Sequence, residues 1–160
     1  MGIRLDDDAR RYLAAFEDVT GVSGIDCVVY DDGGGGDNSN SNSNANSNST
    51  DDDRLLIVVT SGRMGDAIGP GGRTVKQFEA RVGKQVRLVE GAADPADFVA
   101  NTLTPAAVYN VTISETDDTV AYVEVADDDR GVAIGPNGRT IEAARRLAKR
   151  HFAIDDVQLL

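Results

Sequence analysis

The chain contains one nine-residue stretch twice, first as Ala67-Ile68-Gly69-Pro70-Gly71-Gly72-Arg73-Thr74-Val75. The second copy, 66 residues later, reads Ala133-Ile134-Gly135-Pro136-Asn137-Gly138-Arg139-Thr140-Ile141. Seven of the nine positions are identical, and Val75 and Ile141 are a conservative pair. A match this dense rarely arises by chance, so the sequence predicts two copies of one small domain.

The residues around the first copy predict an ordered series of elements. Apolar residues at helical spacing predict a helix over Asp6–Asp18, and β-branched runs predict strands over 25–30 and 55–60. A short helical turn then ends at the glycines, a second helix follows them, and Gln85–Val89 forms a last strand. The first half of the chain therefore has the order αββααβ.

The second half repeats this order at the same size. Asp94 followed by Pro95 starts a helix over 94–103, and strands are predicted over 107–114 and 119–125. Another helical turn, a second helix and a strand over Ile154–Leu159 complete the unit. The sequence thus predicts an α+β fold of two layers in two domains, 1–91 and 92–160.

Residues 33–53 interrupt the first domain between its two predicted strands. The segment is rich in Gly, Asn, Ser and Asp and contains no large apolar side chain. Such a composition cannot bury enough surface to offset the entropy of ordering it. We therefore expect a disordered insertion in a strand connection.

The glycines of the repeat lie where one helix ends and the next begins. Glycine permits positive φ there, and the free N–H groups at the start of the following helix suit an oxyanion such as a phosphate. In one copy alone, a tight bend that needs glycine only for its geometry would explain the pattern. Two copies, each with an arginine directly after the last glycine (Arg73 and Arg139), favour an anion site.

The two stretches resemble the Ile-Gly-x-x-Gly-x-x-Ile signature of KH domains, at Ile68–Val75 and Ile134–Ile141. The order αββααβ is similar to the type II KH arrangement, in which helices pack on one face of a three-stranded sheet. KH modules clamp single-stranded nucleic acid through their GXXG loop. A chain of this length with two such modules resembles the archaeal NusA-like transcription termination and antitermination factors.

The resemblance implies single-stranded RNA as the ligand, with the nascent transcript as its source. Ile68 and Ile134 would offer apolar surface to the bases, whereas Val59 and Val125 are either further base contacts or core residues. Neither variable position of either loop is basic, although many KH loops carry Lys or Arg there. The RNA-binding residues implied are Ile68, Gly69, Pro70, Gly71, Gly72, Arg73, Ile134, Gly135, Pro136, Asn137, Gly138 and Arg139.

The charge of the chain is unevenly distributed. The formal net charge is −11, which by itself argues against a nucleic-acid ligand. However, residues 54–91 carry seven basic and three acidic residues, and residues 130–160 carry six and three. These two segments hold the glycine loops, and their basic residues could line one face: Arg63, Arg73, Lys76, Arg81, Lys84, Arg130, Arg139, Arg145, Arg146, Lys149 and Arg150.

The remaining acidity is of a particular kind. Asp outnumbers Glu by 21 to 6, and Arg outnumbers Lys by 13 to 3. Short carboxylates and few lysines are typical of a surface that works in molar salt, where the Debye length is about 3 Å and like charges repel little. The composition therefore indicates a halophilic protein.

Several classes of protein do not fit the sequence. No apolar run approaches the roughly 18 residues of a membrane span, and the N-terminus resembles no signal peptide. The sequence contains one histidine, one cysteine and no paired-carboxylate or Ser/His/Asp pattern. It therefore predicts no metal site, no catalysis and no cofactor. We expect a cytoplasmic, monomeric RNA-binding protein that works beside RNA polymerase.

Two alternatives remain open at the level of sequence. One is a KH protein of RNA processing or ribosome assembly, which would use the same chemistry with another partner. The other is a protein-interaction scaffold with degenerate KH folds that no longer bind RNA, which the acidity and the non-basic loops would suit.

The halophilic composition gives a testable expectation. Thermal stability should fall sharply when the protein is moved from molar KCl into low salt, because the carboxylates then repel one another unscreened. Circular dichroism melts across a KCl series measure this effect. A melting temperature that does not change with salt would contradict it.

Overall fold

The computed structural model describes residues 6–31 and 53–160. These residues form two compact units, and the boundary along the chain lies between Leu88 and Val89. The predicted disordered insertion, 33–53, lies outside the described residues apart from Asp53, which begins a strand.

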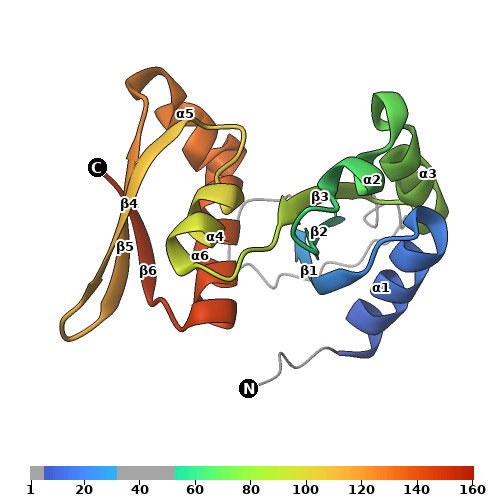
Figure 1. The fold of residues 1–160 in the computed structure, drawn as a ribbon, viewed down its shortest axis with the longest axis horizontal. Helices are drawn as coiled ribbons and strands as arrows, with labels where there is room; N and C mark the ends of the chain where they lie inside the picture. Colours follow the sequence, from blue (N-terminus) through green and yellow to red (C-terminus); the bar gives the residue numbers. More distant parts are fainter. Residues whose placement is uncertain (1–5, 32–52) are drawn as a thin grey trace, which may run out of the picture. The chain divides into compact units, whose positions relative to one another are not determined.

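The first unit is a three-stranded sheet with helices on one side (Figure 1). Strands β1 and β2 pair antiparallel, and the sheet order is β1-β2-β3. A 3₁₀ turn, Pro70–Gly72, lies between the second and third helices. The elements are α1 (Asp7–Thr20), β1 (Gly24–Asp31), β2 (Asp53–Val59), α2 (Met64–Ile68), α3 (Arg73–Val82) and β3 (Gln85–Glu90).

The second unit repeats this arrangement. Its sheet has the order β4-β5-β6, with β4 antiparallel and β6 parallel to β5. A 3₁₀ turn, Pro136–Gly138, again separates two helices, and a second one, Asp127–Asp129, precedes α5. The elements are α4 (Pro95–Thr102), β4 (Val108–Glu115), β5 (Thr119–Val125), α5 (Arg130–Ile134), α6 (Arg139–Phe152) and β6 (Asp156–Leu159). The predicted fold of two αββααβ units is confirmed.

Local signals set the ends of the first helix in each unit. The Asp6 carboxylate accepts a hydrogen bond from the Ala9 N–H (2.7 Å), and Gly21 ends α1 in the left-handed conformation. In α4, Asp94 accepts from the Asp97 N–H (3.0 Å), and Pro95 occupies the first turn. These caps explain why the helix positions could be predicted within two or three residues.

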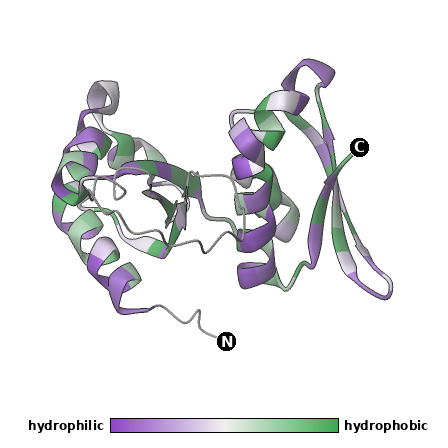
Figure 2. Ribbon diagram, turned by 180° about the vertical axis from the view of Figure 1, so that it is seen from behind, coloured by the Kyte–Doolittle hydropathy of each residue, from purple (hydrophilic) through white to green (hydrophobic). Residues whose placement is uncertain are grey.

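The helices of the first unit pack their apolar sides against one face of the sheet. Phe16 of α1 and Phe78 of α3 are buried and meet edge to face, with ring centroids 5.2 Å apart. Burying side chains of this size stabilises the fold by about 1.5–3 kcal/mol each. Figure 2 shows hydrophilic and hydrophobic residues on different sides of these helices.

Two residues weighed as base contacts belong to these cores. Val59, on the middle strand β2, is fully buried with Phe16 and Phe78. Val125, the equivalent residue on β5, is buried in the core of the second unit. Their side chains point toward the helices and offer no surface to a ligand, so the core interpretation is correct for both.

Small residues allow close packing in the second unit. Ala133, Ala144 and Ala148 are buried against the sheet. Phe98 of α4 lies 5.2 Å (ring centroids) from both Phe152 and His151 of α6. The single histidine therefore contributes to the packing of α4 on α6.

Equivalent positions of α3 and α6 secure the last strand of each unit. In the first unit, the Glu79 carboxylate accepts a hydrogen bond from the Val86 N–H at 3.0 Å. In the second unit, Arg145 lies 66 residues further on, and its Nε donates to the Val157 carbonyl (3.2 Å) and to Asp156 (2.9 Å). One position thus carries opposite charges in the two copies but binds the closing strand in both.

The acidic partner of Arg145 gives a pH prediction. A hydrogen bond from the Gln158 amide, the Val157 N–H and the charge of Arg145 lower the pKa of Asp156. Because the folded state holds the ionised form, this stability is present above the unfolded pKa and is lost as pH falls through the folded value. We expect Asp156→Asn to lower Tm by at most about 2–4 °C at neutral pH and by less near pH 3, in melts at constant KCl. An equal loss at both pH values would contradict this.

Candidate nucleic-acid interface

The two glycine loops have the same backbone conformation. Gly69 has φ 73° and ψ 174°, and Gly135 has φ 78° and ψ 168°. Gly72 and Gly138, which precede the second helices, are both left-handed, at φ 76° and 75°. The repeat in the sequence is therefore also a repeat in geometry.

The first glycine of each loop is required by a close approach. A Cβ on Gly69 would lie 2.0 Å from the Oγ1 atom of Thr74, and one on Gly135 would lie 2.2 Å from that of Thr140. Both glycines also have positive φ, which other residues rarely adopt. The two threonines were not among the predicted site residues, although their identity in both copies was a visible signal.

The variable positions of the loops face solvent. Gly71 has φ 61° with no atom within 4 Å of a Cβ, and its counterpart Asn137 has φ 55°. Asparagine tolerates this conformation better than most residues, so the exchange of Gly for Asn preserves the bend. Pro70 and Pro136 are exposed beside them. Each loop therefore presents backbone to solvent without a bulky side chain over it.

The helices that follow the loops begin without a side-chain cap. Gly72 and Gly138 are the N-cap residues of α3 and α6, and neither has a side chain that could bond the first N–H groups. The N-terminal end of a helix carries partial positive charge. Such a start can bind a phosphate oxygen, as the sequence predicts for both loops.

The two arginines after the loops are placed differently. Arg73 is exposed at the start of α3. Arg139 is half-buried, and its Nη1 atom is shielded from solvent. The sequence predicts equivalent phosphate contacts for the two arginines, whereas the structure exposes Arg73 more than Arg139.

An apolar surface flanks each loop. Ile68 is 38% exposed and Ile134 is 41% exposed, and each directly precedes the first glycine of its loop. The second unit adds Val132, 42% exposed, which the sequence analysis missed. In the first unit its counterpart is Asp66, which pairs with Arg63 at 2.9 Å. The second loop therefore has the larger apolar flank.

The predicted basic face is interrupted by ion pairs. Arg81 pairs with Asp18. Arg145 pairs with Glu142 (2.6 Å) as well as Asp156, and Lys149 pairs with Asp155. Such partly exposed pairs contribute little to stability, but they neutralise charge that a nucleic acid would otherwise meet. Arg73 and Lys76 lie exposed on α3 beside the first loop.

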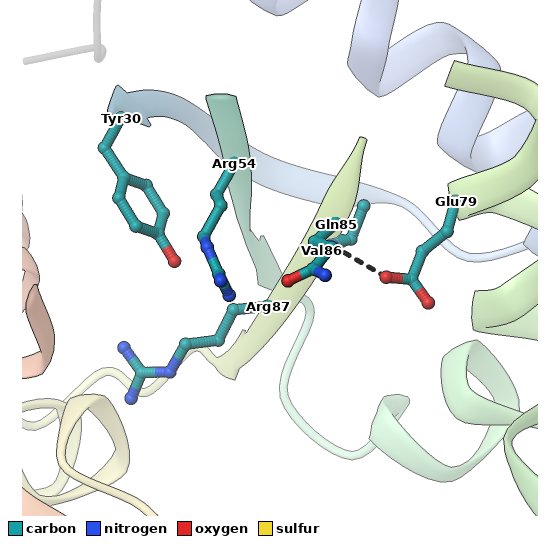
Figure 3. A pocket seen from close by; sticks show the side chains of 6 residues that line it. All are labelled: Tyr30, Arg54, Glu79, Gln85, Val86 and Arg87. Atoms are coloured by element: carbon teal, nitrogen blue, oxygen red, sulfur yellow. Dashed lines mark hydrogen bonds between the residues drawn. The ribbon is translucent and has the colours of Figure 1, made fainter. Parts of the chain in front are cut away.

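Further positive charge gathers in a pocket on the first sheet (Figure 3). Its volume is about 270 Å³, and Tyr30, Arg54 and Arg87 reach it from β1, β2 and β3. Burial lowers the pKa of Arg87. No residue of the first glycine loop lines this pocket. The basic charge of residues 54–91 is thus divided between the pocket and the loop.

Residues 6–31 and 53–160 contain no group of three His, Cys, Asp or Glu side chains that could hold a metal ion. None of the helices among them combines the length and the apolar character needed to cross a membrane.

Family models match both units. The model of the NusA-like second KH domain matches residues 95–159. The model of the KH domain matches residues 42–93. Each match contains one of the two glycine loops.

Individual proteins match nearly the whole chain. It is 50% identical over 159 residues to the probable transcription termination protein NusA of Halobacterium salinarum, and 51% identical to that of Halococcus morrhuae; each match covers 99% of both chains. It is 26% identical to the probable transcription termination protein NusA of Methanocaldococcus jannaschii, over 99% of this chain and 75% of that one. The protein in the crystal structure of APE1850 is 25% identical in sequence to this chain. The two structures align with a TM-score of 0.75, over 98% of this chain and 100% of that one. The Halobacterium and Halococcus relatives agree with the halophilic composition.

The close approach in the loops predicts which glycines can be replaced. Gly69→Ala should destabilise the first unit by about 1–3 kcal/mol, because the methyl group meets Thr74 and the positive φ is strained. Gly71→Asn should change stability by less than about 0.5 kcal/mol, because Asn137 already holds that conformation in the second loop. Chemical denaturation in molar KCl compares the two variants. Equal losses would show that the contact with Thr74 does not set the requirement.

Proposed function

The chain belongs to the NusA family of transcription termination proteins, and on this basis we propose that its two KH domains bind single-stranded RNA through their GXXG loops. The observation that carries the proposal is the pair of loops of matching geometry, each leading into a helix that no side chain caps. In this role the protein takes part in transcription termination or antitermination.

Each loop supplies two kinds of contact to an RNA strand. The N–H of Gly71 or Asn137 and further N–H groups in the first turn of the next helix bind the phosphates. Proline has no N–H, and the N–H groups of Gly72 and Gly138 already donate to the carbonyls of Gly69 and Gly135, at 3.1 and 3.0 Å. Ile68 in the first unit, and Ile134 with Val132 in the second, take the faces of the bases. The larger apolar flank favours tighter stacking of bases at the second loop.

The salt of the surroundings decides which contacts matter most. In molar KCl, release of counterions from the RNA contributes little to the free energy of binding. Affinity then rests on hydrogen bonds from loop amides and on burial of apolar surface, which salt does not screen in the same way. RNA binding of this kind does not require basic residues in the loops. It is also compatible with the ion pairs that neutralise basic side chains of α3 and α6.

The proposed setting follows from the family. The RNA is the nascent transcript, and RNA polymerase is the proposed neighbour in the cytoplasm. The protein acts there as a monomer by binding alone, without a catalytic step or cofactor. Co-purification from cells in high salt tests the setting, with polymerase subunits as the expected partners. Recovery of ribosomal or exosome proteins instead would assign the KH modules to another RNA pathway.

Acidic substitutions in the exposed loop positions test the binding mode. We expect Pro70→Asp with Gly71→Asp, combined with Pro136→Asp and Asn137→Asp, to abolish RNA binding, because carboxylates would face the phosphates. The measurement is fluorescence anisotropy of a labelled single-stranded RNA at high KCl.

Two controls make this result specific. The circular dichroism melt of the quadruple variant should resemble that of the parent protein, since all four positions are exposed. Each double variant tests one loop alone. Undiminished RNA affinity in the quadruple variant would refute binding through the loops.

A further inference from the structure

A groove on the second unit lies outside the RNA interface. It has a volume of about 260 Å³ and runs between helix α4 and strand β4. Ala96, Asp97 and Ala100 line it from α4, and Val108, Tyr109 and Val111 line it from β4. In the sheet order β4-β5-β6, the strand beside it is an edge strand.

The groove and the second glycine loop share no residue, because residues of α4 and β4 line the groove and the loop consists of Gly135 and Pro136–Gly138. Arg130, at the start of α5, donates a hydrogen bond to the carbonyl of Leu160, which follows β6. The start of α5 is therefore held by Leu160 after β6 and, through Asp129, by Ala107 before β4. A ligand beside β4 and an RNA strand at the loop would not compete for the same residues.

The edge strand β4 differs from β3 and β6, the last strands of the two units, in its side-chain hydrogen bonds. Glu79 accepts a hydrogen bond from the Val86 N–H of β3, and Arg145 donates one to the Val157 carbonyl of β6. Strand β4 is eight residues long and contains neither Lys nor Pro. Among the described residues, the side-chain hydrogen bond on this strand joins Asn110 and Thr112, which both belong to β4. An edge of this kind offers a row of backbone N–H and C=O groups to another strand.

The floor and rim of the groove suit an extended chain. Ala96 and Ala100, one helical turn apart, leave room beside α4, and Val108 and Val111 are half-buried below. Tyr109 is 74% exposed at the rim. An added strand would direct alternate side chains into this space, which is the general form of strand addition beside a helix.

The charge around the groove selects the partner. Residues 92–129 contain nine acidic residues and no basic one. Asp97 lines the groove, and Asp129 accepts a hydrogen bond from the Ala107 N–H at 2.7 Å just before β4. A carboxylate that lines the groove would contact a bound segment directly, at the short distances that molar salt screens least, and so favours a cationic side chain there.

We propose that the groove between α4 and β4 binds an extended, lysine- or arginine-bearing segment of a partner protein, which joins the sheet as a fourth strand beside β4. Backbone hydrogen bonds and the apolar floor provide the affinity. The carboxylate side chains favour a positively charged partner. The site is independent of RNA binding by the loops.

A peptide titration tests this site on the full chain. The probe is a short capped peptide that alternates lysine and valine, and the matched control alternates glutamate and valine. In molar KCl, amide resonances of β4 and α4 should shift with the lysine peptide and those of Pro136–Gly138 should not. Shifts confined to the loops, equal binding of the glutamate peptide, or no shift at millimolar peptide would overturn the proposal.

Variants separate the groove from a general charge effect. Ala100→Lys should weaken peptide binding at least about tenfold, because its side chain fills the groove and repels the probe. Gln158→Lys adds the same charge on β6 and should leave the affinity within about twofold. Tyr109→Ala, at a highly exposed position, should weaken binding several-fold without disturbing the fold.

Two further readouts complete the design. The RNA affinity of Ala100→Lys should equal that of the parent, so a failure of the RNA proposal and a failure of this one are distinguishable. Sedimentation should show a monomer at all concentrations used. Concentration-dependent dimers that Ala100→Lys abolishes would assign the edge to a second copy and contradict the proposal.

Discussion

Each unit depends on one close approach, between the first glycine of the loop and the threonine at the second position of the next helix. At Gly69 and Gly135 a Cβ would lie within about 2 Å of the Oγ1 of Thr74 or Thr140, so both positions are restricted to glycine. This contact fixes the bend between α2 and α3 and between α5 and α6. The bend in turn leaves the variable loop residues exposed, the next helix without a side-chain cap, and Ile68 or Ile134 at its flank.

Local signals made most of the fold predictable from the sequence. Asp6 and Asp94 cap the first helices through hydrogen bonds to residues three positions on, which depends on no distant part of the chain. The duplicated glycine stretch located both bends at once. The face that a strand turns toward the helices is a tertiary property. The sequence therefore leaves Val59 and Val125 ambiguous, whereas the fold places both in the cores. The same holds for Arg139, whose Nη1 atom is shielded only in the folded unit.

Charge shows the clearest difference between composition and structure. Basic residues concentrate in the segments that hold the loops, as the sequence indicates. In the fold, however, Arg81, Arg145 and Lys149 pair with carboxylates, and Arg54 and Arg87 gather in a separate pocket. Sequence distance does not reveal these pairs, since Arg81 and Asp18 are 63 residues apart. A halophilic RNA-binding surface of this kind relies on shape and hydrogen bonds more than on net charge.

Both glycine loops are proposed to contact RNA. A titration of the isotope-labelled protein with single-stranded RNA in molar KCl, followed through backbone amide resonances, tests this contact at the level of single residues. The largest shifts should fall on Gly69–Arg73 and Gly135–Arg139. Saturating RNA that leaves both loops unshifted, or shifts only residues elsewhere, would contradict it.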